Sequence, residues 1–562
     1  MNSAIIAIIG ILFLIGNYFL YGKYIEKKIK PTNKKTPSHT NKNKTDFYPS
    51  NKYFLFGHHF ESIAGAGPII GPILAVSYFG WLFTALWIIL GTIFIGAVHD
   101  YLSLMLSVRN KAHGIAKINE KSLGKKSGKI FAIMIYLTLI LIITVFSVST
   151  ADSIIEQPGL VIPMVAISVI AVILGLAVYK FKKNPWISTI IALVFAFYFM
   201  YLGFKHPIIL PFSQQVLKIF WITILISYGA IASFIPIWVF LQPRDYLSST
   251  QLFLFMTLGF SAILIVKPEM NSPQIITGNF PVWPVLFITV ACGAISGFHS
   301  LVASGTTSKQ LSHEKEGRFI GYGGMIAEGM VALLVVLLIS SLPWNFGDLN
   351  FVDSLKQGWV VAFSNGFGNV VSKIGIPFLT FSIASLMGAF IVNQFILTSL
   401  DTSTRLSRMV ISETFTNKIF KNKLTGVLMT IIPAYILAIT NSYVSIWRLF
   451  GTSNQLIAAI ALITISAYFV EHKQKIKFLI IPTAFMIITT LSALFYGLFN
   501  KQGYIAEGNW VLSIISFAMI ILAMIVSYEG IKVIIKKTMR HHTLKGGFVK
   551  ALVFRMIQNL KH

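Results

Sequence analysis

The sequence predicts an all-α, polytopic membrane protein. Hydrophobic residues make up 55% of its 562 positions and charged residues only 12%, whereas soluble globular chains contain about 25% charged residues. Apolar runs recur from Ile5 to Val526, and each is close to the roughly 20 residues that a helix needs to cross a hydrocarbon core about 30 Å thick. These observations exclude an ordinary soluble enzyme.

The apolar runs predict about 15 transmembrane helices, several of them interrupted. The first run has no basic residue before it and no small-residue cleavage signal after it, so we expect a retained helix and not a signal peptide. In chain order the expected spans are 4–22, 53–79, 81–108, 130–151, 160–180, 185–204, 217–241, 246–266, 282–308, 319–341, 374–400, 424–440, 443–470, 478–498 and 509–531.

The formal net charge of +27 is explained by the loops between these spans. Of the 46 Lys and Arg residues, 39 lie in alternate loops, and the opposite loops hold few. Cytoplasmic loops carry an excess of Lys and Arg, which places the N-terminus outside and the C-terminus in the cytoplasm. A nucleic-acid partner would need these charges on one folded soluble face, so we expect none.

Two spans do not have the composition of plain membrane helices. Span 53–79 contains Gly65, Gly67, Pro68, Gly71 and Pro72 within eight positions, and such a stretch should unwind within the membrane. Span 282–308 has a second weak point at Ser304-Gly305-Thr306-Thr307. Paired interrupted spans indicate the central site of a transporter, where helix N-termini face an anionic group and freed carbonyls face a cation.

Ionisable residues within the spans are candidates for function because burying a charge in the membrane is costly. They are His58, His59, Glu61, His99, Asp100, Arg244, Asp245, His299, Glu328, Asp401 and Arg405. Asp100 and Glu328 have no evident partner in their own helices, which favours a role in proton or ion coupling.

Four of these residues also have simpler interpretations. Asp401 and Arg405 have the i, i+4 spacing of a local ion pair. Arg244 and Asp245 are expected to shape a turn and to contact lipid headgroups. A metal site on the histidines is disfavoured because the HExxH spacing is absent, so a membrane-embedded metal hydrolase is the less favoured alternative. No phosphate-binding loop occurs, which indicates an ion gradient as the energy source.

Several long blocks resemble the carbon starvation protein A (CstA) family of bacterial peptide and pyruvate transporters. The blocks are FGHHFESIAGAGPIIGP (56–72), HD (99–100), QPRDYL (242–247), ACGAISGFHSLVASGTTSK (291–309), FIGYGGMIAEG (319–329), LDTSTRLSR (400–408) and WRLFGTSNQLIAA (447–459). The resemblance implies a secondary active carrier of the bacterial inner membrane, with a LeuT-like (APC superfamily) inverted repeat, that serves during carbon starvation.

The apolar runs, the charge pattern and the resemblance together predict a division of the chain. It comprises an N-terminal transmembrane helix (1–22), a Lys-rich cytoplasmic loop (23–52), a CstA-type transporter core (53–470), C-terminal helices (471–531) and a basic cytoplasmic tail (532–562). We expect the loop 23–52 to be a solvated, mobile linker that touches lipid headgroups. The outer loop 343–373 is long enough to act as a lid.

The residues and the resemblance together predict a non-enzymatic symporter without a cofactor, which imports short peptides or pyruvate with protons. The substrate carboxylate is expected at Ala66-Gly67 and Gly305-Thr306. Asp100 or Glu328 would carry the proton. Glu61 is a weaker candidate, because some family members have a small neutral residue there. The resemblance favours His59, Ser304, Thr306, Thr307, Asn454 and Gln455 as lining residues.

Three questions stay open from the sequence. Sodium, held by carbonyls and hydroxyls at Ser304 to Thr307, is the alternative coupling ion. A carboxylate site serves a peptide or pyruvate equally well. The oligomeric state is not predicted.

Overall fold

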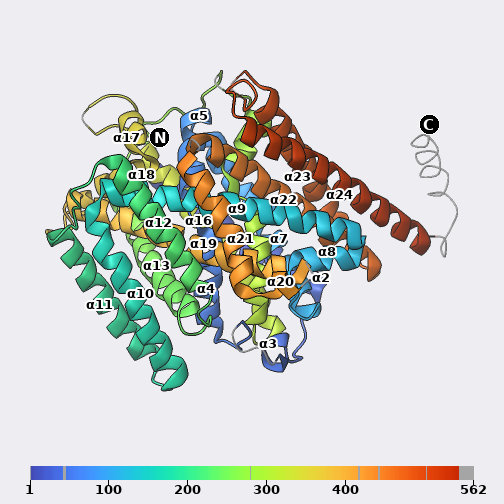
Figure 1. Cartoon of the computed structure of the whole chain (residues 1–562). Coiled ribbons are helices and arrows are strands. Elements are labelled where there is room, and N and C mark those ends of the chain that lie inside the picture. Colours follow the sequence, from blue (N-terminus) through green and yellow to red (C-terminus); the bar gives the residue numbers. More distant parts are fainter. Residues whose placement is uncertain are drawn as a thin grey trace.

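The computed structural model describes residues 2–41, 46–278, 280–347, 349–414, 418–440, 443–501 and 503–542. Across these residues the chain is a bundle of helices, and fourteen helical segments are long and apolar enough to cross a membrane. Figure 1 shows α10 and α11 on one flank of the bundle and α23 and α24 on the opposite side. The prediction of an all-α polytopic protein is confirmed.

Most helices follow the predicted spans, but the predicted span 374–400 corresponds to a longer, later helix (381–414), and the predicted span 217–241 ends at Ala232. In chain order they are α1 (Ser3–Phe19), α2 (Tyr21–Ile29), α3 (Pro37–Thr40), α4 (Lys52–Ala64), α5 (Gly67–Phe79), α6 (Trp81–Gly91), α7 (Ala97–Arg109), α8 (Ile115–Leu123), α9 (Lys125–Glu156), α10 (Val161–Gly175), α11 (Pro185–Lys205), α12 (Gln214–Ala232), α13 (Leu241–Val266), α14 (Phe287–Thr289), α15 (Gly297–Gly305), α16 (Gly323–Ser340), α17 (Phe351–Gln357), α18 (Trp359–Val371), α19 (Phe381–Thr414), α20 (Lys418–Lys421), α21 (Lys423–Thr440), α22 (Tyr443–Glu471), α23 (Lys477–Phe499) and α24 (Trp510–His542).

The predicted span 282–308 is not one helix, which accounts for fourteen long spans in place of fifteen. A helical turn (Val282–Leu286) leads into α14, the backbone then leaves helical geometry, and α15 resumes at Gly297. The break therefore lies at 290–296, and the predicted weak point at 304–307 is instead where α15 ends. Residues 291–297, Ala-Cys-Gly-Ala-Ile-Ser-Gly, contain two glycines but, unlike the first break, no proline.

The two sets of loops gather at opposite ends of the bundle. Near the N-terminus, the Ser3 amide donates to the Pro268 carbonyl at 3.1 Å, and the Asn271 amide donates to the Ser340 carbonyl at 2.7 Å. We call this the N-terminal end and the opposite one the Lys-rich end. The grouping follows the predicted alternation of loop charge; the assignment of each end to the outside or the cytoplasm stays a prediction.

The Lys-rich loop is not the solvated linker that its composition predicts. Thr36 and Ser38 are buried. The amide of Tyr48 donates to the Lys309 carbonyl at 3.2 Å, and the Ser50 amide donates to the Gln310 carbonyl at 3.0 Å. The expectation fails because small hydroxyl side chains between the lysines pair with backbone that follows α15, a contact that composition does not reveal. Residues 42–45 lie outside the described residues.

The predicted loop 343–373 contains two helices, α17 and α18, and α18 packs against α16 and α19. Its action as a lid stays a prediction. At the other end of the chain, α24 continues as far as His542, so the first part of the predicted basic tail is helical. The remainder of the tail, 543–562, lies outside the described residues.

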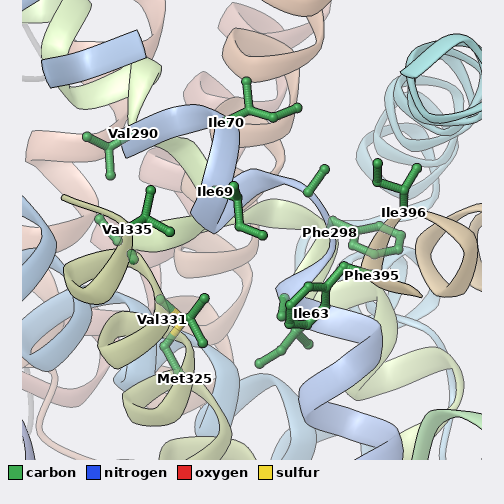
Figure 2. Close-up of a cluster of buried hydrophobic side chains, with 14 of the residues drawn as sticks. Ile63, Ile69, Ile70, Val290, Phe298, Met325, Val331, Val335, Phe395 and Ile396 are labelled. Carbon is green, nitrogen blue, oxygen red and sulfur yellow. The ribbon is translucent and has the colours of Figure 1, made fainter. Parts of the chain in front are cut away.

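The core surrounds the break in the predicted span 53–79. Figure 2 shows hydrophobic side chains from α4, α5, α15, α16 and α19 closing around this break, among them Ile63, Ile69, Phe298, Val331 and Phe395. All of them are buried. Dense apolar packing on every side fixes the position of the unwound backbone, since a well-packed core tolerates little displacement.

Candidate functional site

The two interrupted spans meet in the middle of the bundle. α4 ends at Ala64, and Gly65 has a φ of +50°, in the left-handed region that favours glycine. The span resumes at Gly67, the first residue of α5. A side-chain carbon on Gly67 would collide with Cys292, and one on Gly71 would collide with the Val290 carbonyl. These glycines thus allow the second break to approach the first.

Asn454 and Gln455 stabilise the second break through its backbone. Asn454 Oδ1 accepts from the Phe298 amide at 2.7 Å, which satisfies a free N–H group at the start of α15. Asn454 Nδ2 donates to Ser296 Oγ at 2.9 Å, and Gln455 Nε2 donates to the Ile295 carbonyl at 3.1 Å. Both residues were predicted to line the substrate site; the structure places them on α22 as supports for the unwound chain.

The predicted hydroxyl cluster at 304–307 is buried and already hydrogen-bonded. Ser304 Oγ donates to the Ser300 carbonyl at 2.6 Å and accepts from the Ile115 amide at 3.0 Å. Thr306 Oγ1 donates to the Val302 carbonyl. Thr307 Oγ1 lies 2.9 Å from Nδ1 of His59. The structure brings His59 and Thr307 together, but it leaves Gly305 and Thr306 at the Lys-rich end of α15, separate from the predicted pairing with Ala66-Gly67.

A carboxylate–imidazole cluster joins the two predicted coupling residues. His299, in the first turn of α15, has Nδ1 at 2.8 Å from Asp100 Oδ2 and Nε2 at 3.3 Å from Glu328 Oε2. His99 Nδ1 lies 2.8 Å from Asp100 Oδ1. All four side chains are fully buried. The sequence identified each of these residues because it is ionisable and lies within a predicted span. Their contact depends on the packing of α7, α15 and α16, which the spacing of residues within one helix does not reveal.

A second buried cluster centres on Arg244, and it corrects two predictions. The Arg244 guanidinium pairs with Asp401 and with the Tyr228 hydroxyl, and it donates to Thr398 Oγ1 at 2.7 Å. Arg244 is fully buried in the first turn of α13, so it neither shapes an exposed turn nor contacts headgroups. The predicted local pair of Asp401 with Arg405 is wrong.

Arg405 pairs instead with Asp46 of the Lys-rich loop and holds that loop against α19. Its guanidinium lies 3.3 Å from Asp46 Oδ1, and the Arg408 guanidinium lies 3.6 Å from the same atom. Burial alone would raise the pKa of Asp46, but Lys309, Arg405 and Arg408 outweigh it and hold that pKa below its usual value. Asp46 is therefore a charged anchor between the loop and α19.

His58 and Glu61 extend the second cluster along α4. His58 Nδ1 lies 2.7 Å from Asp245 Oδ2, and Ser62 Oγ donates to the same oxygen at 3.3 Å. Glu61 is 1% exposed, and its Oε2 has no hydrogen-bond partner in the structure. The two adjacent histidines of α4 thus have different partners. His58 contacts the Arg244 cluster, and His59 contacts the segment that follows α15.

A cavity of about 740 Å³ opens at the N-terminal end, and we call it the vestibule. Its deep wall includes Ile70 of α5 and Thr289, immediately before the second break. Its rim and walls are rich in aromatic side chains, namely Tyr78, Phe280, Trp344, Phe351, Trp359, Trp447, Tyr496 and Tyr504. By contrast, a cavity beside Ser304 and Gly305 at the Lys-rich end measures about 30 Å³.

The charged residues among the described ones that line the vestibule are Lys356 and Arg448, and none of the lining residues is acidic. The Arg448 guanidinium pairs with Glu507 at 2.5 Å and lies over the Tyr504 ring. From the sequence, Arg448 was only a basic residue inside a span. Its position in an otherwise uncharged apolar segment is the signal that could have singled it out. Among the described residues, no three His, Cys, Asp or Glu side chains are placed to hold a metal ion.

The chain belongs to the family described as carbon starvation protein CstA, whose profile matches residues 2–355 and 352–493. It is 30% identical to the pyruvate/proton symporter BtsT of Escherichia coli, over 86% of this chain and 80% of that protein. It is 29% identical to the peptide transporter CstA of Bacillus subtilis, over 95% and 97%. The structure of MhsT in complex with L-phenylalanine covers 84% of this chain and 99% of its own, with 12% identity and a TM-score of 0.48. The chain is a multi-pass transporter of a bacterial membrane.

Proposed function

We propose that this member of the CstA family imports small carboxylates, short peptides in the first place and pyruvate as the alternative, with protons as the coupling ion. The vestibule carries the proposal. It reaches from the predicted outer face to both interrupted helices. The charged residues in its described lining are Lys356 and Arg448, which pair with Asp353 and Glu507. A substrate carboxylate could take the place of Glu507 on the Arg448 guanidinium, whose planar N–H donors fit a carboxylate.

The size of the vestibule favours a peptide. Small-molecule sites measure roughly 300–1,000 Å³, and about 740 Å³ equals some 25 water volumes of roughly 30 Å³ each. Pyruvate fills only a small part of this space, whereas a dipeptide or tripeptide with apolar side chains would contact the aromatic walls. Arg448 would receive the carboxylate, and the substrate would then move toward Ala66 and Gly67 at the first break.

The Asp100–His299–Glu328 cluster is suited to bind and release a proton. Two carboxylates and two imidazoles share this buried site, and because unpaired charge is costly there, the protons of the four groups are coupled. A shift of α15 that opened the Lys-rich end would separate His299 from Asp100 and Glu328 and release a proton. The small cavity beside Ser304 and Gly305 is consistent with a form that is open at the N-terminal end and closed at the other.

Uptake by proteoliposomes tests this function. Vesicles with an inward proton gradient should accumulate labelled dialanine above the outside concentration, and collapse of the gradient with a protonophore should abolish accumulation. Competition by unlabelled pyruvate and by tripeptides ranks the substrates. If correctly folded protein accumulates neither dipeptide nor pyruvate, or only equilibrates them as a channel would, the proposal is refuted.

A further inference from the structure

Three helices enclose a small cavity around Glu61, and several polar atoms of its lining have no hydrogen-bond partner. The cavity measures about 10 Å³ and lies between α4, α13 and α19. Its polar lining is Glu61, Ser248, Gln251 and Gln394, and its remaining walls are apolar. Ser248 Oγ donates to Gln394 Oε1 at 3.3 Å. Glu61 Oε2, both amide atoms of Gln251 and Nε2 of Gln394 have no hydrogen-bond partner.

Unsatisfied polar atoms at this depth require an explanation. Glu61 is 1% exposed, Gln251 2% and Gln394 3%. Each unpaired buried polar atom costs roughly 1–3 kcal/mol, and an unpaired charge costs more. The cavity has about the volume of one water-sized particle. These side chains therefore converge on a space the size of one water molecule or small ion.

The charges nearby favour a cation as the ligand of this cavity. Asp245 and Asp401 are already matched to Arg244, which pairs with both. His58 contacts Asp245 and lies away from the cavity lining. Glu61 is thus a third carboxylate beside one guanidinium, and buried charge must be paired or neutralised.

We propose that the cavity is a binding site for one sodium ion, with Glu61 as its charged ligand and the side-chain oxygens of Ser248, Gln251 and Gln394 as neutral ligands. A proton on Glu61 would remove the charge but leave the cavity empty and the Gln251 amide unpartnered. A water molecule alone would leave the charge. A protonated Glu61 together with one water would meet both requirements but would bind no sodium, and the titration below distinguishes that arrangement from an ion. A sodium ion satisfies both requirements, since hard cations prefer oxygen ligands. The amide groups would turn their oxygens toward the ion.

The position of the cavity next to the first break predicts how a bound ion would affect the structure. Glu61 is one turn before the first break, and the neutral ligands are on α13 and α19. A bound ion would hold the end of α4 against these two helices, and its loss would loosen the wall of the central site. The site lies apart from the Asp100–His299–Glu328 cluster and does not depend on proton coupling or on the identity of the substrate.

Binding of sodium to the purified protein tests the site without substrate or gradient. Full-length protein in nanodiscs, prepared in choline chloride, is titrated with NaCl, KCl or choline chloride while thermal unfolding is followed. NaCl should raise the unfolding temperature in a saturable manner, and radioactive sodium should bind at one ion per chain. KCl and choline should leave the temperature unchanged. Equal effects of all three salts would refute the site.

Variants test whether the sodium-dependent rise in unfolding temperature originates at this cavity. Glu61→Gln should abolish the sodium-dependent shift, whereas Glu328→Gln, which removes an equally buried carboxylate elsewhere, should retain it. If Glu61→Gln does not fold, Gln251→Leu and Ser248→Ala retain the carboxylate and should raise the half-saturating sodium concentration about tenfold, which corresponds to loss of one ligand worth about 1.4 kcal/mol. An unchanged value in both would overturn the proposal, and the uptake assay above remains an independent test of transport.

Discussion

Replacement of Arg448 by glutamine removes the guanidinium of the vestibule while keeping a polar, uncharged side chain. A hydrogen bond from a charged donor to a carboxylate contributes roughly 1.5–3 kcal/mol. Arg448 is about one-third exposed and already paired with Glu507, so the substrate must displace a partner in a partly hydrated site, and the lower end of the range applies. Because about 1.4 kcal/mol is a factor of ten, we expect KM for dialanine to rise about tenfold.

The measurement is initial uptake by proteoliposomes over a range of substrate concentrations. The maximal rate should change by less than about threefold, since Arg448 is distant from the Asp100–His299–Glu328 cluster and the loss is one of encounter and binding. Lys356→Gln is the matched control. Its side chain is 72% exposed and paired with Asp353, so KM should change little. A KM for the Arg448 variant within twofold of the parent would refute the role of the vestibule.

Three other predictions concern the proton cluster, the second break and the docked loop. Asp100→Asn should lower proton-driven uptake at least tenfold while substrate-driven exchange persists, because exchange needs no net proton movement; equal loss of both would argue against coupling. Asn454→Ala should reduce the free energy of unfolding by roughly 1–3 kcal/mol, the cost of leaving the Phe298 amide unpaired, as measured by chemical denaturation, with Thr440→Ala as an exposed control. Asp46→Asn should destabilise the protein at neutral pH. Folding lowers the pKa of Asp46, so the stability that its charge contributes is complete above its ordinary pKa and is lost as the pH falls below that value. The two proteins should therefore become equally stable in acid. A difference in stability that stays constant down to low pH would contradict this.

The spans and the first break could be predicted from the sequence because both depend on local chemistry. Apolar length sets a membrane helix, and Gly65 to Pro72 interrupt one directly. The loops could be assigned to two opposite ends of the bundle because the charge of each loop follows from its own residues. The second break was placed too late in the chain, because its loss of helical geometry at 290–296 is stabilised by Asn454 and Gln455, which are distant in sequence.

The candidate site was predictable only as a set of unusual residues. Depth singled out Asp100, His299 and Glu328, but their contact depends on the packing of three helices. The prediction that Asp401 pairs with Arg405 was wrong for the same reason, since Asp401 pairs instead with Arg244 of α13. The LeuT-like inverted repeat was implied by the family and not by the residues, and which helices pair within it stays a prediction.

The docking of the Lys-rich loop has a consequence for how this segment can change during evolution. Its contacts to residues 309 and 310 join main-chain atoms of Tyr48 and Ser50 to main-chain atoms of the segment after α15. Hydrogen bonds of this kind survive substitution of the side chains that flank them. The lysines of the loop are therefore free to be replaced as lineages diverge, while insertions or deletions that shift the register of residues 46–50 would be selected against.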